Sequence, residues 1–150
     1  MSTENTVHTT NGQTAASAEA IQVVDADVLA PVNYQWGSIK WVSDMNVTPG
    51  SQQSIGYAYV MPGGTNPEHR HTSCQEVIYI LAGVLKLFAN GEWLTLRPGQ
   101  TALIPQEVLH VVVNDGWEPA VYLAAFSKAV RDTIFTGSNG QLKASNQENY

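Results

Sequence analysis

Short runs of apolar residues, separated by turn-forming residues, cover the middle of the chain. Glycine, proline and asparagine end most of these runs, and Asn90-Gly91 is a strong hairpin signal between two of them. The pattern predicts strands at 37–42, 55–61, 76–81, 84–88, 93–96, 101–104, 109–113 and 120–126. Regular spacing of this kind favours an all-β fold built as an antiparallel barrel or sandwich. Residues 127–135 suit either a short helix or a last strand.

Both ends of the chain are polar. Residues 1–20 consist largely of Thr, Ser, Asn, Gln and Ala with almost no large apolar side chains, and the last residues have the same character. Such segments bury too little apolar surface to offset the entropy lost on ordering. We therefore expect flexible tails at 1–20 and 136–150, on either side of one domain at 21–135.

The amino-acid composition of the chain excludes several classes of binding partner. The chain has 150 residues, one cysteine and a formal net charge of −6, and its seven basic residues are scattered. A phosphate-neutralising patch and a nucleic-acid partner are therefore not expected, and an internal disulfide is excluded. Charged residues make up only 13%, which favours a sheet protein that is partly buried in an oligomer. With no recognisable signal peptide or membrane span, we expect a soluble cytoplasmic protein without a membrane partner.

The histidines are grouped with one glutamate. Of the four histidines, His69, His71 and His110 fall inside the expected domain. His69 and His71 are two residues apart, so on a strand both imidazoles leave the same face, about 7 Å apart along the backbone. A turn through 72–74 would bring Glu76 beside them, and His110 would arrive from a separate strand. This donor set suits a divalent transition metal and leaves coordination positions open for water, substrate or dioxygen.

The spacing of these residues, and of the glycines around them, resembles the two motifs of the cupin superfamily. The first motif is met by Gly63, His69, His71, Glu76 and Gly83. The second motif is met by Gly99, Pro105, His110 and Asn114. Glu107 stands where the second motif has a glycine, which is the residue normally used at a positive φ. The backbone turn before His110 is therefore the part of the motif that the sequence leaves open.

The resemblance implies a fold, a metal and an assembly. The fold would be a jelly-roll β-barrel covering roughly residues 35–130. The metal would be manganese, iron, nickel or zinc, held inside the barrel by His69, His71, Glu76 and His110. Single-domain cupins commonly form homodimers, and residues 21–35 are a candidate dimerisation arm.

Strand alternation predicts what surrounds the metal. Ile78 and Ile80 share the parity of Glu76, so they are expected to wall a largely apolar cavity. Tyr57 and Tyr59 share one face of the preceding strand, and they either line the cavity or pack between the sheets. Each of these four residues is a candidate for the pocket lining.

The expected chemistry follows from a metal in an apolar cavity. Of the basic residues, only Lys40 and Lys86 remain candidates for the metal face, which disfavours sugar phosphates and dicarboxylates. We expect an enzyme that chelates a small, mostly apolar or aromatic oxygenated substrate and activates it as an enolate. Glu76 would be both ligand and transient proton acceptor, and the reaction would be a dioxygenase-type oxidation.

Two other functions remain open. A redox-silent ion would support a cyclase, an isomerase or a lyase, as in the small polyketide cyclases of this superfamily. A cupin could also bind a metal or a ligand without catalysis, as a sensing or storage module. Cys74, in the turn between His71 and Glu76, is expected to be an inert small residue rather than a further ligand.

Overall fold

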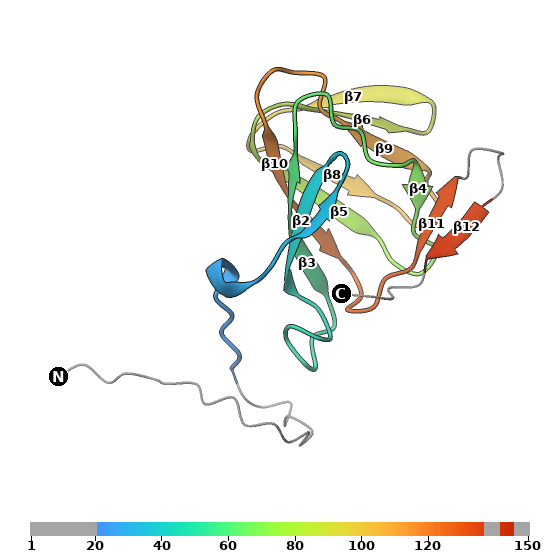
Figure 1. Cartoon of the computed structure of the whole chain (residues 1–150). Helices are drawn as coiled ribbons and strands as arrows, with labels where there is room; N and C mark the ends of the chain where they lie inside the picture. Colours follow the sequence, from blue (N-terminus) through green and yellow to red (C-terminus); the bar gives the residue numbers. More distant parts are fainter. Residues whose placement is uncertain (1–20, 137–141, 146–150) are drawn as a thin grey trace.

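The computed structural model describes residues 21–136 and 142–145 of the chain (Figure 1). Within these residues, one 3-10 helix, η1 (Ala26–Val28), precedes two sheets of six strands each. The first sheet contains β1 (Val32–Tyr34), β2 (Gly37–Ser43), β3 (Ser54–Val60), β5 (Glu76–Ala82), β8 (Thr101–Ile104) and β10 (Ala120–Phe126). The second contains β4 (His69–Arg70), β6 (Leu85–Ala89), β7 (Glu92–Leu96), β9 (His110–Val113), β11 (Thr133–Thr136) and β12 (Leu142–Ser145).

The two sheets form a jelly roll. The strand order is β1-β2-β3-β10-β5-β8 in the first sheet and β12-β11-β4-β9-β6-β7 in the second. All neighbouring strands are antiparallel. The chain crosses repeatedly from one sheet to the other, so that β4 and β5, which follow each other in sequence, belong to different sheets. The all-β antiparallel fold class predicted from the apolar pattern is confirmed. No helix in the described part of the chain is long and apolar enough to cross a membrane.

The predicted strands are recovered with boundaries that differ by at most one residue. Alternation explains their positions: β3 buries every second residue, including Ala58 and Val60, while Tyr57 and Tyr59 face outward. Inward side chains of both sheets form one core, in which Ile78, Ile80, Leu85 and Leu87 are almost completely buried. Burial of each such side chain contributes about 1.5–3 kcal/mol to folding.

The C-terminal boundary of the domain differs from the expectation. Residues 127–135 end in a strand, β11, and not in a helix. The segment 136–150, expected to be a flexible tail, contributes β12, which pairs with β11 from Thr133↔Ser145 to Thr136↔Leu142 (Figure 1). Pairing at a sheet edge uses main-chain groups, so a polar composition does not prevent it. The expected tail at 1–20 lies outside the described residues.

The candidate dimerisation arm, 21–35, is divided into two parts. Val32–Tyr34 is β1, an edge strand that pairs with β2 in the first sheet. Before it, Ile21 and Val23 are 94% and 88% exposed. The residues before β1 are therefore largely exposed, although Gln22 donates to the main-chain oxygen of Pro49 and the main-chain oxygen of Ala26 accepts from Lys40 on β2.

The turn at Gly83 shows why the first cupin motif has a glycine there, and the turn at Glu107 shows how the chain departs from the second motif. Gly83 has φ 73°, and a Cβ on it would lie 2.5 Å from the main-chain oxygen of Pro119, so only glycine fits. Glu107 adopts φ 68° without being glycine, which costs about 1–2 kcal/mol. Its N–H donates to the His71 main-chain oxygen at 2.9 Å, and its carboxylate lies 3.3 Å from Arg70 Nη1. The turn before His110 therefore forms with a glutamate in place of glycine.

Candidate metal centre

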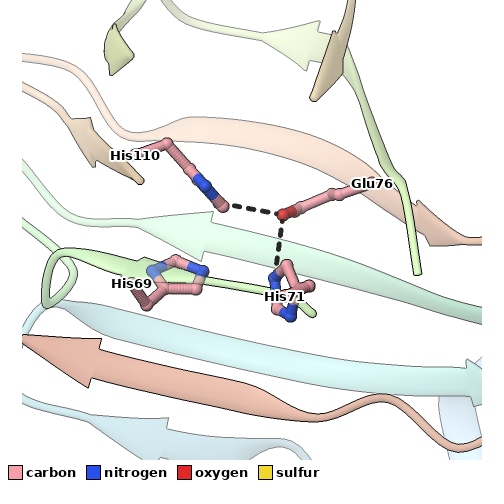
Figure 2. A group of neighbouring side chains, drawn as sticks. All are labelled: His69, His71, Glu76 and His110. Carbon is pink, nitrogen blue, oxygen red and sulfur yellow. Dashed lines mark hydrogen bonds and ion pairs between the residues drawn. The ribbon is translucent and has the colours of Figure 1, made fainter. Parts of the chain in front are cut away.

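Three imidazoles and one carboxylate converge between the two sheets (Figure 2). One ligand atom from each of His69, His71, Glu76 and His110 lies within 4.8 Å of the others. His69 and His110 are direct cross-strand partners on β4 and β9 of the second sheet. Glu76 is the first residue of β5 in the first sheet. The packing of one sheet on the other therefore assembles the cluster.

Main-chain oxygens orient the three rings. The hydrogen bonds are His69 Nδ1 to Pro67 O at 2.8 Å, His71 Nδ1 to Asp132 O at 2.6 Å, and His110 Nδ1 to Val108 O at 3.0 Å. A carbonyl oxygen only accepts, so each Nδ1 carries a hydrogen. This leaves Nε2 of each ring as the atom available to a metal.

Glu76 supplies the negative charge of the cluster. Its Oε2 lies 3.1 Å from Nε2 of His110, a hydrogen bond, and 3.3 Å from Nε2 of His71. Burial alone would raise the pKa of Glu76, but the hydrogen bond from His110, the close approach of His71 and the charges of both imidazoles outweigh burial and lower it. Burial opposes a charge on His110 as well, yet the hydrogen bond and charge of Glu76 raise the pKa of His110 above its usual value.

The imidazole nitrogens of His69 and His71 also favour a cation at the centre of the cluster. Burial, and then the charge of His110, lowers the pKa of His69 to about 4, so this ring is neutral at neutral pH. The close approach of His71 Nε2 to Glu76 lacks hydrogen-bond geometry, so this buried atom has no hydrogen-bond partner in the described part of the chain. Leaving such a group unsatisfied costs about 1–3 kcal/mol. A divalent ion bound by the three Nε2 atoms and the carboxylate would remove that cost, so the residues fit a metal whose identity they do not select.

Asp132 holds the turn that separates the ligands, and sequence reasoning missed it. Its carboxylate accepts hydrogen bonds from the N–H groups of Thr72 and Ser73, each at 2.9 Å, and from both hydroxyls. Burial would raise the pKa of Asp132, but these hydrogen bonds lower it. Its main-chain oxygen also orients His71. Asp132 is therefore a positioning residue. It lies between two strands and far in sequence from both motifs, so no sequence pattern indicated its role.

The single cysteine is not part of the centre. Cys74 is completely buried in the core and lies outside the four-residue cluster. Burial, followed by the charge of Asp132, raises the pKa of its thiol. A buried thiol of raised pKa is a poor nucleophile, which agrees with the expected inert role.

A cavity of about 140 Å³ opens beside the cluster. All four cluster residues line it, and six of the other lining residues are aromatic: Tyr34, Trp36, Trp41, Tyr122, Phe126 and Phe135. An engineered protein cavity of about 150 Å³ holds benzene, so the volume suits a ligand of that size. His71, Glu76 and His110 are buried, whereas His69 is partly exposed, so the cluster is accessible from one side.

The four candidate pocket residues do not line this cavity. Tyr57 and Tyr59 are 43% and 41% exposed on the outer face of β3, so their assignment to the cavity is wrong. Alternation identifies residues that share a face, but it does not say which face is the inner one. Ile78 and Ile80 point inward as predicted, but they are fully buried in the core and do not line the cavity. Glu76 is the only residue of β5 that lines it.

The basic residue of the cavity is Arg131, which the sequence did not indicate. Lys40 donates to the main-chain oxygen of Ala26 at 2.8 Å, and Lys86 lies 2.5 Å from the Asp115 carboxylate; neither lines the cavity. Arg131 does line it. It belongs to the segment 127–135, whose structure the apolar pattern left undecided.

Comparisons with known proteins agree with the fold and the motifs. Residues 56–126, which include every motif residue, match the family model described as Cupin domain. The Rhicadhesin receptor of Pisum sativum is 30% identical over 106 residues, which are 65% of this chain and 46% of that protein. The chain spans about half the length of the curated relatives it matches.

Two solved structures show the same fold. An oxalate decarboxylase of Lactobacillus farciminis, in a formate complex, has a TM-score of 0.67 at 24% identity, covering 73% of this chain and 34% of that one. A sugar phosphate isomerase of the cupin superfamily from Silicibacter pomeroyi has a TM-score of 0.63 at 17% identity, covering 84% and 93%. With its two motifs, its jelly roll and its His-Glu cluster, the chain belongs to the cupin superfamily.

Proposed function

We propose that the chain is a metal-dependent enzyme that binds a small oxygenated substrate directly at the His-Glu cluster and oxidises it as a dioxygenase. The observation that supports this proposal is the cavity beside the cluster, which all four cluster residues line. Structural metal sites are closed by protein ligands, whereas catalytic sites keep a position open. A ligand set that faces a cavity therefore favours catalysis over a purely structural metal.

The residues of the cavity have separate roles in this proposal. A bound divalent ion would supply Lewis acidity and open coordination positions for substrate oxygens. His69, His71 and His110 hold their Nε2 atoms toward one point because main-chain oxygens fix their Nδ1 atoms. Glu76 turns Oε2 toward the histidines and would accept the proton whose loss converts a carbonyl substrate to its enolate. The aromatic walls would hold the apolar part of the substrate and exclude water.

A redox-silent reaction is the second candidate. Imidazole and carboxylate ligands accept zinc as well as manganese, iron and nickel, so the donor set does not favour a redox-active ion. The same cavity and the same Glu76 would then serve a cyclase, an isomerase or a lyase. The choice depends on the ion that the protein carries.

Oxygen uptake would separate these functions. Protein loaded in turn with iron, manganese, nickel and zinc would be mixed with β-diketones, catechols and flavonols. We expect oxygen consumption with a redox-active ion and none with zinc. The matched variants are Glu76→Gln, expected to lose turnover, and Glu107→Gln, expected to keep it because that exposed carboxylate lies outside the cavity. Substrate conversion without oxygen uptake would support the cyclase, isomerase or lyase, and tight binding without conversion would support a non-catalytic module.

We also propose that the chain is a homodimer through the outer face of the first sheet. Tyr57, Leu123 and Tyr79 are direct neighbours across β3, β10 and β5, and they form one row on that face. Tyr57 and Tyr79 are 43% and 38% exposed, and Leu103 on β8 is 58% exposed. A row of this kind that spans adjacent strands is an apolar patch of the type found at interfaces.

Sedimentation velocity would test the dimer. The wild-type protein is expected to sediment as a dimer and Tyr79→Glu as a monomer, because a buried charge would face the apolar row of the second copy. Trp93→Glu is the matched control, since Trp93 is 58% exposed on β7 of the other sheet. A monomeric wild-type protein, or a variant at Tyr79 that remains dimeric, would contradict this interface.

A further inference from the structure

We propose that the Tyr122 hydroxyl is a ligand-binding group of the metal cavity and selects substrates that carry an acceptor oxygen besides those that face the His-Glu cluster. The acceptor would be a hydroxyl or carbonyl oxygen, because the phenol donates one hydrogen bond. This inference rests on the proposed function in one respect, that the substrate fills this cavity. It narrows the expected substrate from a molecule with a plain apolar body to one whose body carries a further oxygen.

Tyr122 lies on an inner strand of the first sheet, with its side chain in the wall of the cavity. β10 lies between β3 and β5, and the cross-strand neighbours of Tyr122 are Ala58 and Ile80, which are apolar and completely buried. Tyr122 is only 3% exposed, and it lines the cavity. Burial, and then the charges of Glu76 and Tyr34, raises the pKa of its phenol, and both of those residues line the same cavity. The hydroxyl therefore faces the cavity rather than the apolar core.

The Tyr122 hydroxyl has no hydrogen-bond partner among the described residues. Its phenol has a raised pKa to which no hydrogen bond contributes. The hydroxyl therefore keeps its proton at neutral pH and remains available as a donor. Among the other polar residues of the wall, Tyr34, Arg131 and Thr133 have further interactions in the structure. Tyr122 thus differs from them in offering a buried donor that only the contents of the cavity can satisfy.

A ligand that fills the cavity meets both this donor and the cluster. The volume is about 140 Å³, close to that of a cavity that holds one benzene ring, so a ligand of that size contacts the walls on every side. Three inward residues of β10 line the cavity in order, namely Tyr122, Ala124 and Phe126, and Phe126 is the cross-strand partner of Glu76. Only the small side chain of Ala124 lies on this strand between the phenol and the residue beside the cluster.

The hydroxyl penalises a ligand that cannot accept from it. A cavity of this volume admits water, which can accept the hydrogen bond while no ligand is bound. A ligand that displaces the water without an acceptor of its own leaves a buried donor unsatisfied, which weakens binding by roughly five- to hundredfold. Sites that hydrogen-bond a substrate oxygen reject the analogue without that oxygen for the same reason. Tyr122 is thus suited to select a substrate by its additional oxygen.

The test compares catechol with pyrogallol and 1,2,4-benzenetriol, which place a third hydroxyl at the two distinct free positions of the catechol ring. Zinc-loaded protein would be titrated calorimetrically without oxygen, so that neither turnover nor oxidation of the ligands enters the measurement. The wild-type protein is expected to bind one of the triols more tightly than catechol. Tyr122→Phe is expected to weaken binding of that triol by roughly five- to fiftyfold. Its affinity for catechol should stay the same or rise slightly, because the variant no longer buries an unsatisfied hydroxyl.

Controls separate this inference from loss of the fold and from the proposed function. Tyr122→Phe keeps the ring and breaks no hydrogen bond within the described part of the chain, so its zinc content and thermal midpoint should match those of the wild-type protein. Tyr59→Phe is the matched control, because it removes an exposed hydroxyl on the outer face of β3, and it should change no affinity.

The outcomes distinguish the inference from the proposed oxidation. Triol-to-catechol affinity ratios that are equal in the wild-type protein and Tyr122→Phe would overturn the inference and leave the proposed function intact. A selective loss in Tyr122→Phe, together with no oxygen uptake by any loaded form, would support the inference and contradict the oxidation. Failure of all three ligands to bind would contradict the cavity as the substrate site, and with it the role of Tyr122.

Discussion

His110→Ala is expected to remove most of the bound metal. His110 supplies one of the three inward Nε2 atoms and is the hydrogen-bond partner of Glu76, so the variant loses a ligand and releases a second one from its fixed position. Loss of a residue that merely orients a ligand weakens metal binding by about 10–100-fold, so loss of the ligand itself should exceed roughly a hundredfold. Metal content after dialysis, measured by elemental analysis, and competition with a chromophoric chelator would check this.

The same variant has a second expected effect, on the protein without metal. Removal of His110 leaves the buried Glu76 carboxylate without its hydrogen-bond partner, which destabilises a fold by about 3–5 kcal/mol where a buried pair is broken. The thermal midpoint of the chelator-treated variant should therefore fall as well. Val111→Ala is the matched control, because Val111 follows on the same strand and is not among the cluster or cavity residues. His8→Ala removes the one histidine outside the cluster and should leave metal content unchanged. An unchanged metal stoichiometry in His110→Ala would refute the assignment of this ligand.

Three ligands of the cluster could be predicted from short spacings, and His110 from the resemblance to the second cupin motif. His69 and His71 share a face because they are two residues apart, and the turn after His71 brings Glu76 onto the neighbouring strand. Even Glu107, where the motif has glycine, forms the turn before His110 in the left-handed conformation. For His69, His71 and Glu76, strand parity and turn position together were sufficient, whereas the conformation of Glu107 had to come from the structure.

Residues brought to the site by long-range packing could not be predicted. Asp132 and Arg131 belong to a segment without a motif, and only the return of the chain to the second sheet places them beside His71 and the cavity. The inward face of β3 could not be chosen by alternation, because both of its faces carry apolar side chains. Main-chain pairing created β12 in a segment whose composition predicts a tail. A cytoplasmic location remains a prediction from composition.

Metal affinity is expected to rise with pH until His110 is deprotonated. In the metal-free protein the pKa of His110 is raised above its usual value by Glu76, so a proton occupies the Nε2 atom that the metal needs. The proton on His110 must leave when an ion binds, so zinc affinity should fall at least tenfold for each pH unit below that pKa. Below about pH 4, where His69 is also protonated, a second proton should steepen the dependence. Competition titrations with a chelator of known pH dependence would measure the slope, and a pH-independent affinity would be incompatible with a proton on His110.

The stability of the metal-free protein should show the opposite trend above neutral pH. A histidine has an unfolded pKa of about 6.5, and His110 titrates above that value when folded, so its stabilising effect is complete below pH 6.5 and is lost as pH rises through the folded pKa. His69 titrates at about 4 when folded, so it destabilises the fold at low pH and ceases to do so as pH rises from about 4 to about 6.5. These two contributions place the stability maximum of the cluster near pH 6.5.

With zinc bound, no proton remains on the cluster to be lost, and the decline in stability above that pH should disappear. Thermal midpoints of chelated and zinc-loaded protein, measured across this range, would test both trends, because a metal-free protein whose midpoint keeps rising above pH 6.5 would show that Glu76 and His110 do not share a proton.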